Sequence, residues 1–334
     1  MTKRYAGVDL FRVLGLFFVN ALHANLYNGF YFFPQEGATV VALNSLRWLF
    51  FGCNGMFMLM TGYLKTTKPF DKKYYRGLLP ILVGYLLTCV VSYPIRYFLI
   101  GETDPLNVWI ERLFTFSNYA WYVEMYIGLI LISPFINMAL DKLEKPKNQL
   151  WFATVMVILT ALPSITAKNF FINYWTAMYP ITYYVIGAVI RRIQPKVNSL
   201  LCFIEALAVA LGLGIATMVT ATEGFNSGFG QGYGGFWITV MVTFLFLSMY
   251  RLKLGETASW ILSKISGGVF EGYILSRLFD VWIYSSIKEC HNPIGNLKLY
   301  LFVTIPVFIV SLTAGNLLHF VSVKLTSPRK KETA

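Results

Sequence analysis

Two side chains able to do chemistry, Arg12 and His23, lie in the first long apolar stretch of the chain. They are 11 residues apart, and a helix that turns by about 100° and rises by about 1.5 Å per residue places them on one face, roughly 16 Å apart. An arginine offers a fixed fork of donors to a phosphate or carboxylate, and a histidine exchanges a proton near neutral pH. Because an ionisable group inside a membrane helix is energetically costly, it usually has a functional role. This helical face is therefore a candidate functional site, with Arg12 and His23 at two different depths in the membrane.

Both residues also have structural interpretations. His23 could be a buried imidazole that is hydrogen-bonded to a neighbouring helix. Arg12 could extend to the membrane interface with Asp9, one helical turn away, as its partner. The sequence leaves these alternatives open.

Two further residues could assist His23. Asn20 lies on the same helical stripe, and Glu124 follows an aromatic pair at the start of a later apolar segment. Glu124 could orient His23 or bind an acceptor, or it could form a salt bridge with Arg47 or Arg96. An acid or amide beside a histidine would tune it as a general base.

The composition indicates a membrane protein. The chain has 334 residues, of which 56% are hydrophobic and only 13% charged, outside the usual range for a soluble domain. The net charge of +12 argues little for nucleic acid, because the basic residues lie in short loops without an aromatic-basic platform. The four cysteines have no C-x-x-C spacing, and no histidine has acidic or cysteine partners at ligand spacing, so no metal site is expected.

Ten apolar segments are long enough to cross a bilayer. We predict an all-α polytopic bundle with these spans: 8–28, 42–64, 77–100, 119–140, 150–167, 174–191, 198–220, 234–250, 258–284 and 298–322. Lysine and arginine gather in alternate loops, which places both termini in the cytoplasm. Residues 1–325 then form one membrane domain, and 326–334 form a short basic cytoplasmic tail.

Several motifs resemble the acyltransferase 3 family of bacterial membrane enzymes, whose members O-acetylate cell-surface glycans. Arg12 and His23, with ten residues between them, resemble its arginine–histidine signature, and Val8-Asp9-Leu10-Phe11 resembles the lead into that arginine. The resemblance extends along nearly the whole chain through the following stretches: Met56 to Leu64, Ala120 to Pro134, and Tyr179 to Gly187.

The chain departs from the family pattern at two places. Lys73-Tyr74-Tyr75-Arg76 stands where the family has two arginines with two residues between them, so the first position keeps its charge but loses bidentate geometry. This pair could hold the phosphates of coenzyme A or could be an ordinary cytoplasmic anchor. Ser276 stands where members commonly have a late histidine, so no role for that histidine is carried over.

The resemblance implies a multi-pass O-acetyltransferase of the inner or plasma membrane. It would move an acyl group, expected to be acetyl from cytoplasmic acetyl-CoA, to a hydroxyl of a capsule, exopolysaccharide or other surface glycan, or of its lipid-linked precursor. The expected partners are acyl-CoA, the glycan and membrane lipids, with no nucleic acid and no metal. In this hypothesis Arg12, Lys73 and Arg76 hold the phosphates, and the thioester reaches His23 through a tunnel.

Alternatives remain for the mechanism and for the function. His23, oriented by Glu124 or Asn20, would act as general base, and a covalent acyl-histidine is the mechanistic rival. Ten spans and buried charges also fit a flippase of lipid-linked glycan. A non-catalytic membrane sensor on the same fold gains weight from the missing late histidine.

Overall fold

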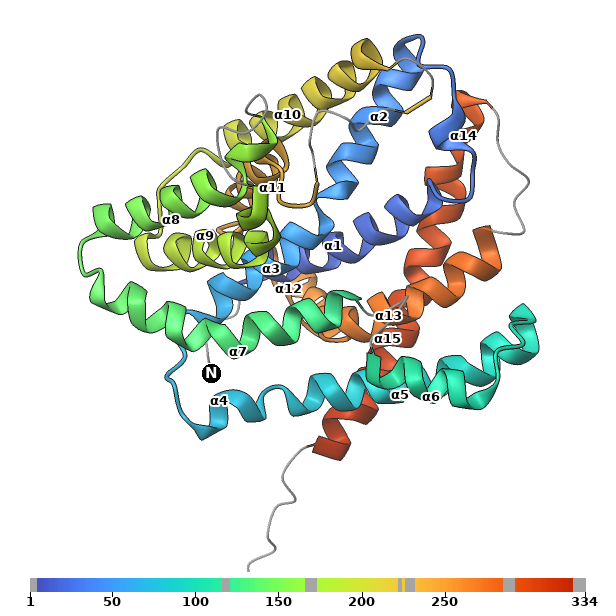
Figure 1. Ribbon diagram of the computed structural model, residues 1–334, viewed down its shortest axis with the longest axis horizontal. Coiled ribbons are helices and arrows are strands. Elements are labelled where there is room, and N and C mark those ends of the chain that lie inside the picture. The colour runs from blue at the N-terminus through green and yellow to red at the C-terminus, as the bar shows by residue number, and fades with distance from the viewer. Residues whose placement is uncertain are drawn as a thin grey trace, which may run out of the picture.

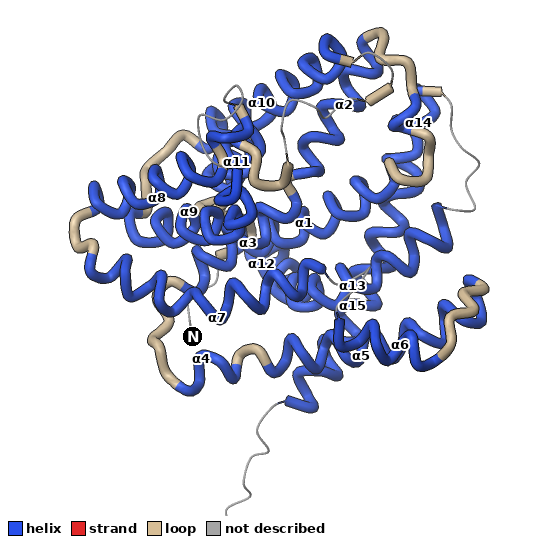
Figure 2. The backbone as a smooth tube through the Cα atoms, viewed as in Figure 1, coloured by secondary structure: helices blue, strands red, loops and turns tan. Residues whose placement is uncertain are grey.

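Helices account for every regular element in the described part of the chain. The computed structural model describes residues 5–115, 121–165, 173–221, 224–225, 232–284 and 292–326. Within these ranges helices are joined by short loops and no strand occurs (Figure 2). A helix satisfies its backbone hydrogen bonds internally, as an apolar surrounding requires. The predicted all-α fold class is confirmed.

The α-helices vary from one turn to six turns in length. Their bounds are α1 Ala6–Ala24, α2 Ala38–Phe51, α3 Cys53–Lys65, α4 Lys72–Arg76, α5 Leu79–Ile95, α6 Leu106–Thr115, α7 Trp121–Lys142, α8 Pro146–Thr160, α9 Tyr179–Ile193, α10 Ser199–Thr220, α11 Phe236–Met249, α12 Glu256–Ile265, α13 Val269–Phe279, α14 Pro293–Leu299 and α15 Ile305–Thr326. Short 3-10 turns are η1 Phe30–Phe32, η3 Leu162–Ser164, η4 Asn173–Met178 and η5 Ser266–Gly268, and π turns are η2 Arg96–Ile100, η6 Asp280–Tyr284 and η7 Tyr300–Thr304.

Helix α1 lies in the middle of the molecule, with α2, α10 and α11 on one side and α13 and α15 on the other (Figure 1). Most of its residues are buried. Phe11 meets Phe246 of α11 edge to face with ring centroids 5.0 Å apart, and Gly15 faces the ring of Phe57 on α3. Packing on several sides of α1 brings its ionisable side chains into contact with other helices and turns.

Among the described residues, five helical segments are long and apolar enough to cross a membrane, judged by length and composition alone. They are Ala6–Ala24, Tyr74–Phe98, Trp121–Lys142, Ser199–Thr220 and Pro293–Thr326. They correspond to half of the ten segments predicted from the sequence. The number ten and the cytoplasmic placement of both termini stay predictions.

Two of the remaining predicted spans are interrupted. The segment 42–64 is divided between α2 and α3 at Gly52, and 258–284 is divided between α12 and α13 by the turn η5. At η5, a β-carbon on Gly268 would collide with the backbone of Asn316 on α15, and the Gly268 N–H donates to the Asn316 side chain at 3.2 Å. Close packing against α15 therefore accompanies the second interruption.

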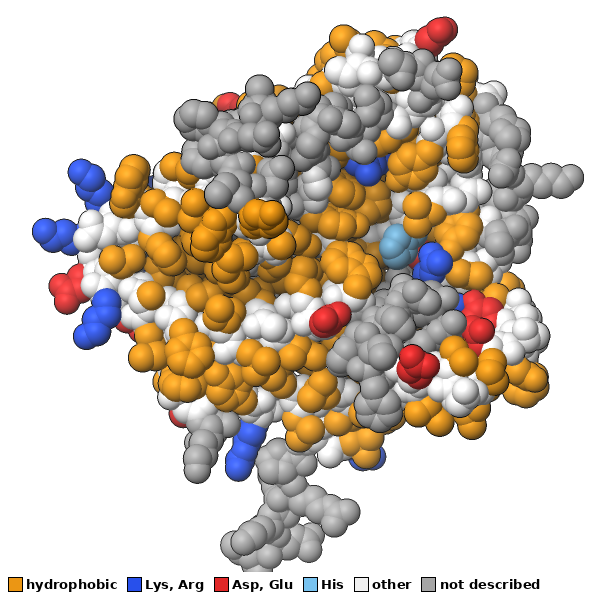
Figure 3. Space-filling view, viewed as in Figure 1, with side chains coloured by type: hydrophobic (Ala, Val, Ile, Leu, Met, Phe, Trp, Pro, Cys, Tyr) orange, Lys and Arg blue, Asp and Glu red, His pale blue; other side chains and the backbone are white. Residues whose placement is uncertain are grey.

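Large hydrophobic side chains cover much of the surface, as the broad orange area in Figure 3 shows. On α10, Leu200, Leu211 and Val219 are 67%, 48% and 73% exposed. A soluble monomer rarely exposes apolar patches of such extent. With the five long apolar helices, this surface indicates a membrane protein.

The predicted division into a domain and a basic tail stays a prediction. The domain boundary at residue 325 falls within α15, and residues 327–334 lie outside the described residues.

Candidate functional site

His23, on the last turn of α1, contacts a buried carboxylate. Its Nδ1 lies 2.5 Å from Oδ2 of Asp280, the first residue of η6. The Asp280 side chain is fully buried, while a quarter of the His23 side chain is exposed. With Nδ1 held by the Asp280 carboxyl group, the imidazole keeps Nε2 for a substrate proton. This is the arrangement of an oriented general base.

Glu124, predicted as a possible partner of His23, lies elsewhere. It is exposed in the first turn of α7, and the carboxylate that contacts His23 is that of Asp280. The two arginines proposed as alternative partners of Glu124 have other neighbours. Arg96 pairs with Glu102, and the Arg47 guanidinium lies over the rings of Trp48, Phe51 and Phe225. A role of Glu124 in binding an acceptor stays a prediction.

Asn20 is fully buried one turn before His23. Its backbone oxygen accepts a hydrogen bond from Tyr284 of η6 at 3.2 Å. Asn20 and His23 of α1 therefore both contact η6, one through Tyr284 and the other through Asp280. Both polar atoms of the Asn20 side chain lack a hydrogen-bond partner within the described structure. Buried polar groups are normally satisfied, which keeps Asn20 a candidate for substrate contact.

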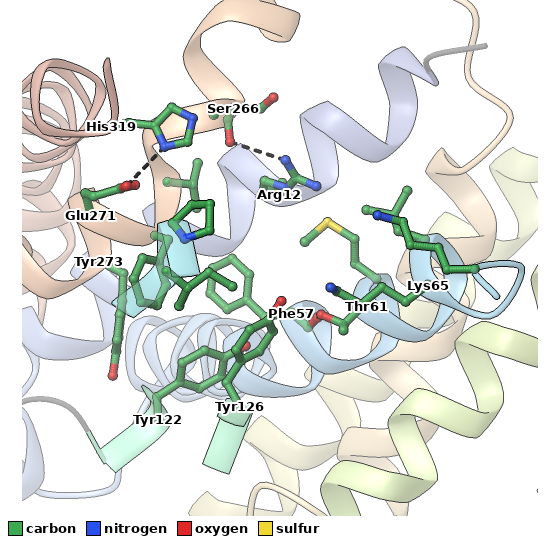
Figure 4. A pocket seen from close by; sticks show the side chains of 18 residues that line it. Arg12, Phe57, Thr61, Lys65, Tyr122, Tyr126, Ser266, Glu271, Tyr273 and His319 are labelled. Atoms are coloured by element: carbon green, nitrogen blue, oxygen red, sulfur yellow. Dashed lines mark hydrogen bonds and ion pairs between the residues drawn. The ribbon is translucent and has the colours of Figure 1, made fainter. Parts of the chain in front are cut away.

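A cavity of about 330 Å³ lies beside Arg12. We call it the Arg12 cavity. Its walls come from helices α1, α3, α5, α7, α13 and α15 and from η5. Figure 4 shows Arg12, Lys65 and His319 around it, with Phe57, Tyr122, Tyr126 and Tyr273 as aromatic lining.

The turn η5 fixes Arg12 at the cavity wall. Nη1 of Arg12 donates to the Ser266 carbonyl at 3.5 Å, and the Ser266 hydroxyl donates to Asp9 at 2.9 Å. Asp9 and Arg12 are one turn apart on α1, so one helical face contacts one turn of chain. Arg12 thereby contributes a cation to the cavity.

Two further cations in this cavity were missed by the sequence analysis. Lys65 ends α3 and Lys68 follows it, and both line the Arg12 cavity. Lys65 lies outside the five candidate spans, and burial, reinforced by nearby Lys68, lowers its pKa to about 8. It therefore carries charge at neutral pH, in an environment that disfavours that charge unless an anion is present.

The basic pair proposed from the resemblance is placed differently. Arg76 is exposed at the end of α4 and does not line the Arg12 cavity. The backbone of Lys73 belongs to α4, but its side chain lies outside the described structure. Of the two predicted phosphate ligands whose side chains are described, Arg12 lines this cavity and Arg76 does not.

A second histidine–carboxylate pair lines the Arg12 cavity. Nδ1 of His319 on α15 lies 3.0 Å from Oε1 of Glu271 on α13, and the Ser322 hydroxyl donates to the same oxygen at 3.3 Å. The sequence analysis gave His319 no acidic partner, because these residues are 48 positions apart.

The structure does not show the predicted tunnel. Neither His23 nor Asn20 lines the Arg12 cavity, whose wall on α13 extends to Tyr273. Tyr273 precedes Asp280 by seven residues, about 10 Å along a helix. On α1, Leu16 lies between Arg12 and His23, is fully buried and packs against Gly272 of α13. Packed side chains therefore separate the cavity from the His23–Asp280 pair.

No group of three or more histidine, cysteine, aspartate or glutamate side chains within the described ranges could hold a metal ion.

Comparison with known families identifies a match over nearly the whole chain. The family described as an acyltransferase domain matches residues 5–315, which include both histidine–carboxylate pairs except His319 itself. No curated protein and no solved structure matches the chain.

Proposed function

The chain belongs to the acyltransferase 3 family, and from this premise we propose that it is a membrane O-acetyltransferase. In this proposal the donor is cytoplasmic acetyl-CoA. The acceptor is a hydroxyl of a surface polysaccharide, such as a capsule or exopolysaccharide, or of its lipid-linked precursor, and the enzyme resides in the inner or plasma membrane. The family supports acyl transfer, and the apolar helices support the membrane setting.

The His23–Asp280 pair is the observation that carries the proposal. Nε2 of His23 accepts the proton of the acceptor hydroxyl while its oxygen attacks the thioester carbonyl carbon. The carbon–sulfur bond breaks, and the thiolate takes the proton from the imidazolium, so the histidine is regenerated. Asp280 holds the ring orientation and stabilises the transient imidazolium.

The Arg12 cavity supports binding of an anionic donor. Arg12, Lys65 and Lys68 present cations to one space, and phosphate oxygens are good acceptors for such donors. Lys73 and Arg76 remain proposed contacts for a part of the donor outside this cavity. The separation of the cavity from His23 requires the thioester arm to displace packed side chains near Leu16.

The acyl-histidine route stays the mechanistic rival, because the same Nε2 could attack the thioester directly. An acetyl adduct on the protein after incubation with acetyl-CoA alone, detected by rapid mass spectrometry of the intact protein at neutral pH and absent from His23→Ala, would favour that route. Direct transfer predicts no adduct before the acceptor is added.

The test of the function is thiol release from acetyl-CoA by the purified full-length protein with candidate glycans. We expect the wild type to release thiol and acetylate the glycan, and His23→Ala to lower the rate by about 10²–10⁴-fold. Exposed Glu205 offers a control, since Glu205→Gln should keep the wild-type rate. Undiminished acetylation by His23→Ala would overturn the proposal, and glycan translocation without thiol release would favour a flippase.

A further inference from the structure

The His319–Glu271 pair is not used by acyl transfer at His23. Glu271 is almost fully buried, with a 3% exposed side chain, whereas 35% of the His319 side chain is exposed at the wall of the Arg12 cavity. Because Nδ1 is held by Glu271, Nε2 is the nitrogen left for a ligand in the cavity. A buried carboxylate that orients a half-buried histidine indicates a fixed binding group.

The local structure holds this imidazole in place from two sides. Ser322 donates to the Glu271 carboxylate, and Nε2 and Cδ2 of His319 lie 3.1 Å from where a β-carbon on Gly267 would stand. Any side chain larger than that of glycine at this point of η5 would push the ring edge away by a few tenths of an ångström. The same turn contacts Arg12 through Ser266, so Arg12 and His319 are positioned relative to each other.

The Arg12 cavity has one cationic end. Lys65 and Lys68 lie at the end of α3, and Phe57 precedes Lys65 by eight residues on the same helix, about 12 Å away along its axis. In Figure 4, Arg12 lies between Lys65 and His319, and Phe57, Tyr122 and Tyr126 line another side. Charge is thus concentrated at one end, and His319 faces a largely apolar remainder.

The volume of the cavity limits its occupant. About 330 Å³ is at the lower end of the roughly 300–1,000 Å³ of small-molecule sites. This volume suits a linear arm better than a complete nucleotide coenzyme. Acetyl-CoA, the donor of the proposed function, has an anionic part and such an arm, because its phosphates are followed by a linear arm with two amides. An amide in an apolar cavity needs a hydrogen-bond partner, because leaving it unpaired costs free energy.

We propose that His319, held by Glu271, binds an amide of the donor's pantetheine arm, while Arg12, Lys65 and Lys68 bind its phosphates. This inference rests on the proposed function, and it names the residue that recognises the neutral part of the donor. Nε2 accepts from an amide N–H in one tautomer or donates to an amide oxygen when the ring is protonated. His319 is a binding residue, so it affects donor affinity rather than the chemical step.

The test compares two ligands on the full-length protein in detergent. Coenzyme A contains the arm, and adenosine 3′,5′-bisphosphate contains phosphates without it. We expect His319→Gln to raise the Kd of coenzyme A about fivefold, the effect of one hydrogen bond, and to leave the Kd of the bisphosphate unchanged in titration calorimetry. Lys65→Gln combined with Lys68→Gln should weaken both ligands.

The variant and its control separate binding from folding. Glutamine keeps an N–H donor for Glu271, and Glu205→Gln, at an exposed position on α10 that does not line the cavity, is the control. We expect Glu205→Gln to bind both ligands as the wild type does. At saturating acetyl-CoA, the kcat of His319→Gln should equal that of the wild type.

Three results would overturn the inference. The first is an equal rise in the Kd of both ligands in His319→Gln, and the second is no rise in either Kd. The third is a fall in kcat without a change in the Kd of coenzyme A. If wild-type protein binds neither ligand, the donor of the proposed function is wrong and this inference fails with it. Binding of both ligands with no discrimination by His319 leaves the proposed donor intact and refutes the inference alone.

Discussion

The protein contains two histidine–carboxylate pairs whose surroundings differ. In both, Nδ1 of the histidine contacts a buried carboxylate supplied by the α13–η6 segment. The His23–Asp280 contact is 2.5 Å long, and Oδ1 of Asp280 has no hydrogen-bond partner among the described residues. The His319–Glu271 contact is 3.0 Å long, and Oε1 of Glu271 is shared with Ser322.

The neighbours, rather than the pairs themselves, distinguish the two regions. His319 faces a cavity that also contains Arg12, Lys65 and Lys68, whereas His23 lies outside that cavity. A carboxylate held against a histidine can stabilise the imidazolium of a proton transfer. A histidine beside fixed cations is better suited to holding an anionic donor. Under the two proposals above, the same pair of residue types would serve two purposes.

Neutralising Asp280 tests the comparison most severely. We expect Asp280→Asn to lower kcat for acetyl transfer by about 10²-fold, because the imidazolium loses its carboxylate while other groups still bind the substrates. The KM for acetyl-CoA should stay within about twofold of the wild-type value, since Asp280 makes no donor contact. Steady-state thiol release measures both constants. A large rise in KM with an unchanged kcat would assign Asp280 to donor binding and remove the distinction.

The cationic character of the Arg12 cavity should depend on pH. Burial lowers the pKa of Lys65 from its ordinary 10.5 to about 8, so Lys65 is charged below pH 8 and neutral above it. We expect the Kd of adenosine 3′,5′-bisphosphate, measured by calorimetry, to rise about threefold between pH 7 and pH 9, as one cation of the cavity is lost. Lys65→Arg should bind equally at both pH values, and an equally steep rise in that variant would exclude Lys65 as the cause.

Loss of the Lys65 charge at high pH weakens anion binding but has the opposite effect on the stability of the fold. The unfolded chain binds more protons at this position between pH 8 and pH 10.5, because Lys65 keeps its ordinary pKa there. The contribution of Lys65 to the free energy of unfolding therefore rises with pH across this window and is constant below it.

The smallest expected effect concerns the turn η5. A β-carbon on Gly267 would stand 3.1 Å from the His319 ring, so Gly267→Ala should displace the ring by a few tenths of an ångström. We expect the Kd of coenzyme A to rise about twofold, with kcat at saturation unchanged. Gly255→Ala is the matched control, because a β-carbon there has open space. A loss of kcat in Gly267→Ala would connect the two pairs in the chemical step.

The sequence predicted what local patterns determine. Apolar runs gave the helical fold, and the spacing of Arg12 and His23 gave one helical face, which α1 presents to its neighbours. The breaks at Gly52 and η5 were missed because one apolar segment was predicted across each of them, even though Lys264 and Ser266 precede a Gly-Gly pair at η5. Glycines that permit close helix contact, such as Gly268 against Asn316, have no signature of their own in an apolar run.

The partners of the ionisable residues depend on tertiary packing, which explains why they were missed. Asp280 is 257 positions from His23, and no periodicity within one helix connects such positions. Glu124 was the nearest plausible acid by predicted depth, but depth alone does not determine which helices are adjacent. Lys65 resembled an ordinary cytoplasmic lysine until α3 was placed beside the cavity.

Both carboxylates are carried by one uninterrupted stretch of helix. Glu271 and Asp280 are nine residues apart, and α13 continues directly into η6. A rigid displacement of this stretch moves both acids together. A donor that shifts it therefore changes acceptor affinity by some factor, and the acceptor must change donor affinity by the same factor. The order in which donor and acceptor bind then changes the intermediate complex that forms, but not the total free energy of binding both substrates.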